Sequence, residues 1–248
     1  MTIPNAEKQF LQALPSAIKL EQRYALEAIG HSLTAIRISY KRLQSHALYH
    51  DAIECSEIEC RASWFVDAWA IVDATYALST LLRSKQANLS PPGSSRYEEE
   101  FNTASLIRNK LDHLAQNLNN LSSRNLKVLP VFGLLSYFKT KQGGGDMVLV
   151  TSVFIAGDGS ISIPNPAGHE IEAPVGYFHF SAFDLVSNLS KLNLYATELL
   201  NFLNGDYARL AYDQLRDAAK LNGIDPRLAT EPGPTGLVIS IGMSHTSA

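Results

Sequence analysis

Only two cysteines, Cys55 and Cys60, occur in the 248 residues of this chain. A disulfide scaffold is therefore excluded, and a reducing cytoplasm is the expected location. No run approaches the roughly 18–20 uninterrupted apolar residues of a membrane span, so we expect neither an integral membrane protein nor a membrane partner. Residues 1–8 lack the basic and then apolar build of a signal peptide. The net charge of −3 excludes a generally basic nucleic-acid coat and leaves room only for a local basic patch.

The residues that are present have the composition of a folded globular protein, with 46% hydrophobic and 18% charged residues. No internal repeat and no shift in composition divides the chain, so we expect a single domain over residues 1–248. Within it we distinguish a helical hairpin with a third helix (1–125), a β insertion (126–180), C-terminal helices (181–223) and a loose tail (224–248).

Apolar residues recur every three or four positions through much of the first stretch, which is the spacing of an amphipathic helix. The spacing predicts helices over 16–50, 54–86 and 97–121. Pro15 and Ser16 suit the start of the first helix, since Pro has no backbone donor and Ser caps readily. The short connection between the first two helices predicts an antiparallel hairpin.

The pattern changes between residues 126 and 180, where β-branched and aromatic residues alternate with Gly-, Pro- and Asn-rich turns. Strands are predicted over 134–140, 147–155, 160–163 and 177–180, and 237–241 could add another. Helical spacing resumes at Phe183, and a further helix is predicted over 206–221. The predicted fold class is mainly α, an antiparallel bundle of four to five helices that carries a small antiparallel β-sheet insertion.

The most specific local string lies on the third predicted helix, where Arg108 is followed by Asn109 and, five positions after the Arg, by His113. In these residues the sequence resembles the HEPN superfamily, helical-bundle proteins with an R-x(4–6)-H motif and commonly Asn, Asp or His after the Arg. The resemblance covers the motif and the helical skeleton but not the β insertion. It implies a metal-independent endoribonuclease with no cofactor, whose site forms across a homodimer and whose substrate is RNA. It also implies a toxin, stress or phage-defence setting, in which a protein inhibitor or antitoxin is a partner.

The chemistry of RNA cleavage suits these residue types. A neutral His113 can take a proton from a ribose 2′-hydroxyl, and Arg108 can stabilise the charge that grows on the phosphate. Asn109 could orient either group, and attack by the 2′-oxygen leaves a cyclic phosphate. At ~100° per residue, Arg108 and His113 point about 140° apart on one continuous helix. Either the helix bends or a second copy of the chain completes the site, as a twofold axis does naturally.

The same residues leave other interpretations open. Arg108 could simply pair with Asp112 on a solvated helix face, an interaction worth about 0.3–0.5 kcal/mol. The chain would then be a non-catalytic HEPN-like module that binds a protein or a nucleic acid. An enzyme of another kind, with a pocket at the junction of the sheet and the helices, is a further alternative. A basic strip beside the motif could come from Lys110, Arg124, Lys127, Lys139 and Lys141.

No metal site is expected from the cluster of His and Cys residues near the first helix junction. His46 and His50 have the four-residue spacing of some zinc ligands, but Cys55 and Cys60 stand five apart and lack the C-x2-C hook. We therefore interpret both cysteines as small buried apolar residues.

Overall fold

The computed structural model describes residues 10–49, 58–89, 91–114, 116, 132–141, 144–151 and 163–232. The predicted fold class is confirmed, since the chain is mainly helical with a small antiparallel sheet. Its internal contacts form two compact units, one of residues 28–202 and one of residues 1–27 and 203–248. This grouping does not test independent folding, so the single domain predicted for the whole chain stays a prediction.

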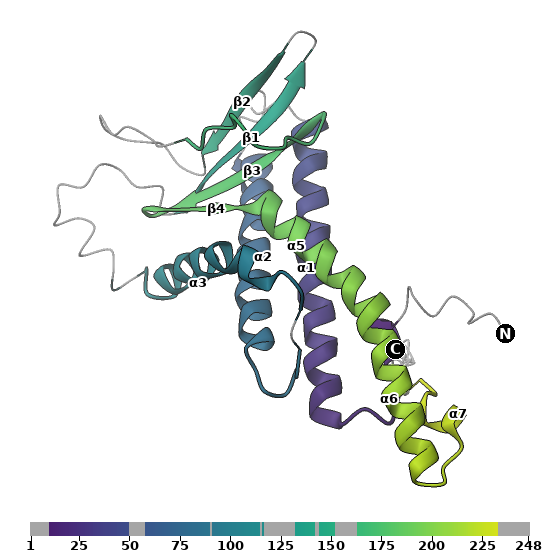
Figure 1. Cartoon of the computed structure of the whole chain (residues 1–248). Coiled ribbons are helices and arrows are strands. Elements are labelled where there is room, and N and C mark those ends of the chain that lie inside the picture. The colour runs from purple at the N-terminus through teal and green to yellow at the C-terminus, as the bar shows by residue number, and fades with distance from the viewer. Residues whose placement is uncertain are drawn as a thin grey trace, which may run out of the picture. The chain divides into compact units, whose positions relative to one another are not determined.

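Two long helices form the centre of the larger unit, and they correspond to the predicted hairpin (Figure 1). Helix α1 spans Leu20–Tyr49 and α2 spans Ile58–Leu82. They run antiparallel, because Arg42 of α1 pairs with Asp67 of α2 while His46, one turn further along α1, stacks on Trp64, one turn earlier in α2. Residues 54–57, where the second helix was predicted to begin, lie outside the described part of the chain.

Helix α2 is apolar on almost every side, as expected of a helix that packs against several partners. By length and composition alone, its stretch Arg61–Leu82 could cross a membrane, a test that core helices of soluble proteins also pass. The two carboxylates within the stretch Arg61–Leu82 each pair with an Arg of another helix, Asp67 with Arg42 and Asp73 with Arg108. These contacts are consistent with a core helix of a soluble protein.

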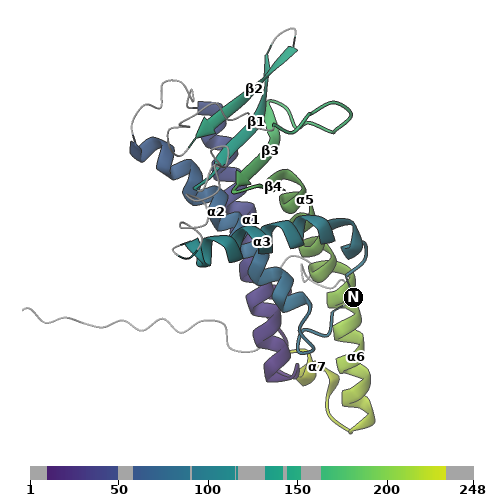
Figure 2. The same ribbon diagram turned by 90° about the vertical axis from the view of Figure 1, so that its left-hand side faces the viewer.

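Helix α3, Glu98–Asp112, crosses α2 and follows a short 3-10 turn, η3, Ser94–Tyr97 (Figures 1 and 2). Three consecutive carboxylates open α3, where they interact favourably with the positive end of the helix dipole. The helix packs on α2 and buries Phe101, Ala104 and Ile107, of which Phe101 meets Tyr195 of α5 (Leu189–Phe202) edge to face. The predicted helix over 97–121 is confirmed to Asp112, and residues 117–121 lie outside the described chain.

The sheet has the order β2-β1-β3-β4, and all neighbouring strands are antiparallel. The four strands are β1 (Leu134–Lys141), β2 (Gly144–Thr151), β3 (Val175–Ala182) and β4 (Leu185–Asn188). The predictions for β1, β2 and β3 are confirmed within a few residues. Of the strand predicted over 160–163, only Ile163 is described, and it is in no strand.

The last strand, β4, was not predicted, and the expectation that a helix resumes at Phe183 is wrong. Phe183 instead adopts a left-handed backbone conformation (φ 58) in the tight turn that reverses the chain between β3 and β4. The sheet therefore continues to Asn188, eight residues past the predicted end of the insertion, and α5 (Leu189–Phe202) begins directly after it.

A column of aromatic rings fixes the sheet on the two long helices. Trp64 of α2, which is fully buried, stacks on Tyr137 of β1 with ring centroids 5.5 Å apart. Tyr137 stacks on Phe178 of β3 at 5.2 Å, and Phe178 meets Tyr40 of α1 edge to face at 5.5 Å. Ring contacts of this kind stabilise the fold by more than the burial of their apolar surface alone.

A chain of hydrogen bonds joins the same strand to α1 and α5. The backbone N–H of Phe178 donates to Ser190 Oγ (2.9 Å), and Tyr40 donates to Glu172 Oε2 (2.9 Å). Because the Tyr40 proton is used on Glu172, the Ser190 hydroxyl donates to Tyr40 Oη across the 2.7 Å that separates them. These bonds fix α1, β3 and α5, which are distant in sequence, relative to one another.

The smaller unit contains the turn η2 (Phe10–Gln12), a π turn η4 (Leu203–Tyr207), α6 (Ala208–Leu221) and the short α7 (Pro226–Ala229). Buried Phe10 lies edge to face against Tyr207 and Tyr212, with ring centroids 5.8 and 5.7 Å apart. Helix α6 ends at Leu221, as predicted, and Asn222 is its C-cap residue.

Both ends of this unit differ from the predictions. The first helix begins at Leu20 and not at residue 16, because Pro15 forms a bridge with Pro232 and the Ser16 N–H donates to Glu231 O (3.0 Å). The tail predicted to be loose from residue 224 is structured to Pro232, since Asp225 caps α7 by accepting from the Arg227 N–H. The strand suggested for 237–241 lies outside the described residues.

We predict that Tyr40→Phe lowers the free energy of unfolding by about 1–2 kcal/mol, because it breaks two hydrogen bonds at a buried site. Urea denaturation of the full chain measures the change. Tyr76→Phe is the matched control, because Tyr76 lies exposed on α2. Equal stability of the two variants would contradict a structural role for the Tyr40 hydroxyl.

Candidate functional site

Arg108, the first predicted catalytic residue, anchors the end of α3 to α2. Its Nε lies 2.7 Å from Asp73 Oδ1 on α2, and its Nη1 donates to Asp112, one turn further along α3. The pairing with Asp112 that the sequence suggested is therefore present, and it does not decide whether the motif is catalytic. Burial raises the pKa of the Asp73 carboxyl; the positive charge of Arg108 lowers it, and the charge of Asp112 adds to the rise.

The other two predicted residues, Asn109 and His113, are exposed in the last turn of α3. His113 is the C-cap residue, and its N–H donates to the Asn109 carbonyl oxygen (3.2 Å). Arg108 faces α2, and no hydrogen bond or ion pair joins it to His113 among the described residues.

The charges around Arg108 limit what it can bind. Two carboxylates, Asp73 and Asp112, pair with the single guanidinium, so the cluster carries a formal charge of −1. Within the described part of the chain, Nη2 of Arg108 has no bonding partner and could still donate to a phosphate oxygen. A phosphate would bind best by displacing Asp112, whose side chain is half exposed.

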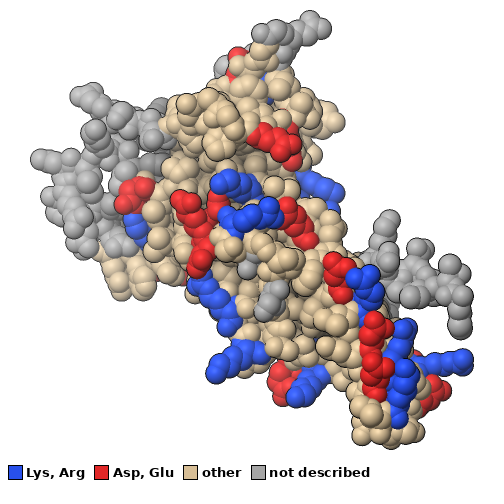
Figure 3. Space-filling model, viewed as in Figure 1, with Lys and Arg blue, Asp and Glu red and all other residues tan. Residues whose placement is uncertain are grey.

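Of the five residues suggested for a basic strip, the structure describes the side chains of Lys110 and Lys139 only, so the strip stays a prediction. Lys110 bonds Asp184 in the β3–β4 turn, and its Nζ lies 5.8 Å from the centre of the Phe183 ring. Arg124 and Lys127 lie outside the described chain, as does the side chain of Lys141. On the face seen in Figure 3, basic and acidic side chains are interspersed.

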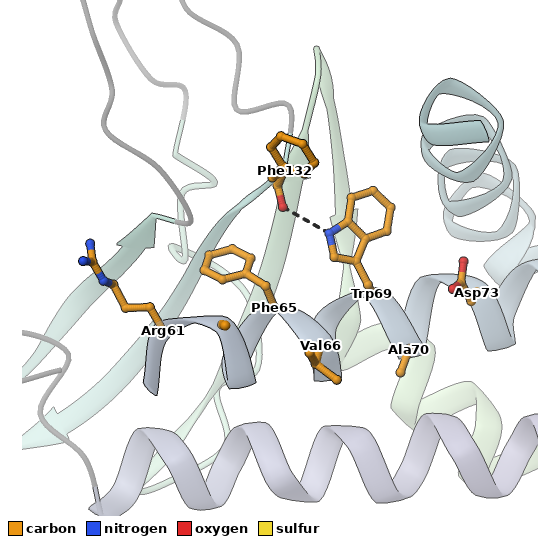
Figure 4. Close-up of a pocket in the computed structure, with 8 residues that line it drawn as sticks. Arg61, Phe65, Val66, Trp69, Ala70, Asp73 and Phe132 are labelled. Atoms are coloured by element: carbon orange, nitrogen blue, oxygen red, sulfur yellow. Dashed lines mark hydrogen bonds between the residues drawn. The ribbon is translucent and has the colours of Figure 1, made fainter. Parts of the chain in front are cut away.

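An apolar groove of about 510 Å³ runs along α2 and reaches Asp73, the partner of Arg108 (Figure 4). Phe65 and Trp69 point toward Phe132, whose carbonyl oxygen accepts a hydrogen bond from Trp69 Nε1 (3.1 Å). Val66 and Phe132 are 59% and 50% exposed, unusually open for large apolar side chains beside a core helix.

Gly133 gives the chain its path from this groove into β1. Its backbone has a φ of 118°, and a Cβ there would lie 2.2 Å from the ring of Phe180. Any other residue at this position would displace the ring of Phe180 and crowd that of Phe65. The groove therefore lies where the first strand of the sheet is attached to α2.

A second, polar cavity of about 380 Å³ lies where α3, the segment 164–169, β3, β4 and α5 meet. The side chains in it that can form hydrogen bonds or carry charge include Glu100, His169, Tyr177, His179 and Lys191. This cavity occupies the junction of sheet and helices that the sequence offered as an alternative site, although none of these residues was singled out there.

Three ionisable residues of this cavity are buried, namely Glu100, Tyr177 and His179. Glu100 is only 8% exposed and bonds Lys191 Nζ (2.7 Å), which raises the pKa of Lys191. Burial lowers the pKa of His179, and the nearby His169 and Lys191 lower it further; the hydrogen bond between its Nδ1 and the Tyr177 carbonyl oxygen (3.1 Å) acts in the opposite direction. His179 was detectable as the one histidine in a predicted strand of otherwise aromatic residues, but its partners Glu100 and Lys191 from α3 and α5 were not.

Among the described residues, no group of three or more His, Cys, Asp or Glu side chains is placed to hold a metal ion. His46 contacts Asp67 and Trp64, whereas His50 and Cys55 lie outside the described residues and the side chain of Cys60 is not described.

No family model, curated protein or solved structure matches this chain.

We predict that acid destabilises the protein through His179. Its pKa in the folded state lies below the ordinary 6.5, so in the window below pH 6.5 the unfolded chain binds more protons. The free energy of unfolding should therefore fall as the pH decreases below 6.5, by at most about 1.4 kcal/mol per pH unit for this one group.

Urea denaturation at pH 7.5 and pH 5.5 tests this prediction by comparing the wild type with His179→Gln. The variant should lose less stability on acidification, whereas His31→Gln, at an exposed position on α1, should behave as the wild type. An identical loss in all three proteins would show that His179 is not the group responsible.

Proposed function

We propose that this protein is a HEPN-like, metal-independent endoribonuclease whose active site forms where two copies of the chain meet beside their α3 helices. The observation that carries the proposal is the apolar groove on α2, because it ends at the residue that holds Arg108. A site that needs a second chain needs an interface next to its motif, and exposed apolar side chains such as Val66 and Phe132 are suited to one.

A twofold contact at this groove supplies what one chain lacks. Contacts across a twofold axis place the same surface opposite itself, so the α3 end of each copy approaches that of the other. Exposed His113 of one copy can then face Arg108 of its twin. Helical geometry, which turns the two side chains about 140° apart within one chain, supports this arrangement and argues against a monomeric enzyme.

The motif residues then have distinct roles. His113, as general base, takes the proton of the ribose 2′-hydroxyl, whose oxygen attacks the adjacent phosphorus. Arg108, oriented by Asp73, stabilises the negative charge that develops on the phosphate oxygens. Asn109 positions the phosphate from the exposed side of the same turn. The bond between phosphorus and the 5′-oxygen breaks, this oxygen takes a proton from solvent water and leaves as a hydroxyl, and the RNA retains a 2′,3′-cyclic phosphate.

A second function, a non-catalytic interaction module, is favoured by one specific observation. Two carboxylates already neutralise Arg108, which is the arrangement of a structural ion pair. In that case the groove on α2 binds a partner protein and the motif only secures α3. The expected cytoplasmic location rests on the low cysteine content of the chain, whereas a toxin or defence role under the control of an inhibitor rests on the family resemblance alone.

We predict that purified protein cleaves single-stranded RNA in the presence of EDTA and that His113→Ala abolishes the cleavage. The melting temperature should not change, because His113 is exposed and makes no side-chain bond among the described residues. His31→Ala is the matched control and should cleave normally. Arg108→Ala is a less clean test, since it also leaves Asp73 unpaired.

Cleavage that EDTA abolishes, or that survives in His113→Ala, would exclude the proposed mechanism. A clean wild-type preparation that leaves RNA intact would favour the interaction module.

We also predict that Val66→Asp converts the dimer into a monomer and removes RNA cleavage, because it places a charge in the apolar groove. Sedimentation velocity measures the mass, and Leu194→Asp, at an exposed position on α5, is the control. A wild-type protein that is monomeric while it cleaves RNA, or a fully active dimer of Val66→Asp, would contradict this interface.

A further inference from the structure

We propose that the polar cavity between α3, β3, β4 and α5 is a binding site for a nucleobase. Its volume of about 380 Å³ is of the size that small planar ligands occupy in proteins, roughly 300–1,000 Å³. The site is distinct from the motif, because Glu100 and Thr103 line the cavity on one side of α3 while Arg108 faces α2. The proposal therefore does not depend on the proposed ribonuclease activity.

The alternation of β3 directs two residues into this cavity. Phe178 and Phe180 pack toward α1 and α2, so Tyr177 and His179 project from the opposite face of the strand. Tyr177 is held there in a left-handed backbone conformation (φ 56), which is unfavourable for an aromatic residue. Its hydroxyl donates to the Asn165 carbonyl oxygen (2.7 Å), which fixes the ring.

The cavity offers a hydrogen-bond acceptor close to a donor. The Nδ1 of His179 is bonded to the Tyr177 carbonyl oxygen, so in the neutral ring Nδ1 carries the proton and Nε2 is an acceptor. His179 is only 5% exposed, and its Nε2 has no bonding partner among the described residues. Lys191 uses one of its three donors on Glu100 and retains two.

This pairing of functions matches the edge of a nucleobase, where a ring N–H or amino group stands next to a carbonyl oxygen or ring nitrogen. The base would donate to His179 Nε2 and accept from Lys191. His169, whose ring is exposed and 5.4 Å from that of Tyr177, supplies a face on which the base can stack.

The charges of the cavity favour the base over a phosphate as the recognised group. Glu99 and Glu100 carry two formal negative charges against the single positive charge of Lys191. A phosphate would meet a formal charge of −1, whereas a neutral heterocycle meets no such penalty. Binding should therefore depend weakly on salt, unlike binding that is driven by contacts to the nucleic-acid backbone.

Titration of the full-length protein with the four ribonucleoside monophosphates tests the site, with ribose 5-phosphate as the ligand that lacks a base. Calorimetry gives the affinity, and ¹⁵N NMR of the histidine rings reports on His179 Nε2. At least one mononucleotide should bind and shift the His179 signal, while ribose 5-phosphate should do neither. His169→Ala should weaken binding roughly tenfold through lost stacking, and His31→Ala should bind as the wild type.

A 2′-O-methyl trinucleotide, which cannot be cleaved by 2′-hydroxyl attack, distinguishes the two sources of a base. Tighter binding of the mononucleotide assigns the cavity to a free nucleotide, and tighter binding of the trinucleotide assigns it to an unpaired base of an RNA chain. Equal binding of ribose 5-phosphate, unchanged affinity in both His169→Ala and His179→Gln, or no binding of any of these ligands would overturn the proposal. RNA cleavage enters none of these measurements, so the ribonuclease proposal can fail independently.

Discussion

The stack of Trp64 on Tyr137 and of Tyr137 on Phe178 is the constraint on which the larger unit depends. It ties a buried helix to the two central strands of the sheet. Once Phe178 faces the helices, the alternation of β3 commits Tyr177 and His179 to the other face. The polar cavity is thus a consequence of how the sheet is attached, and the aromatic column fixes the strand that carries two of its main residues.

Helix α2 connects this core to the motif. Its sides contact α1, the sheet and α3, and what remains is the groove between Phe65, Trp69 and Phe132. Asp73 stands at the end of that groove and holds Arg108 in place. The proposed interface and the proposed catalytic residue therefore share one helix, so that the formation of a dimer and the completion of the site are a single event in this account.

Much of the fold could be predicted because it depends on local spacing. Apolar repeats of three and four residues identified α1, α2 and α3, and β-branched and aromatic runs identified β1 to β3. The sequence could not show that Asp73, 35 residues before Arg108, is its partner, because pairing across helices depends on how they cross. It also could not show β4, whose four residues have an apolar spacing that suits a helix equally well, or the pairing of Pro15 with Pro232 that delays the start of α1. The motif residues could be predicted from the sequence. The role of Glu100 and Lys191 in the polar cavity could not, because only the contact between α3 and α5 brings the two side chains together.

The central claim is that the exposed end of α3 performs 2′-hydroxyl chemistry on RNA. The most direct test compares two defined RNAs that differ at one nucleotide, which carries either ribose or 2′-deoxyribose at the cleavage point. The measurement determines the chemical ends of the fragments that purified protein releases from each. The account predicts 2′,3′-cyclic phosphate and 5′-hydroxyl ends from the ribose substrate and no cleavage next to the deoxy nucleotide. Fragments with 3′-hydroxyl and 5′-phosphate ends, or equal cleavage of both substrates, would contradict it.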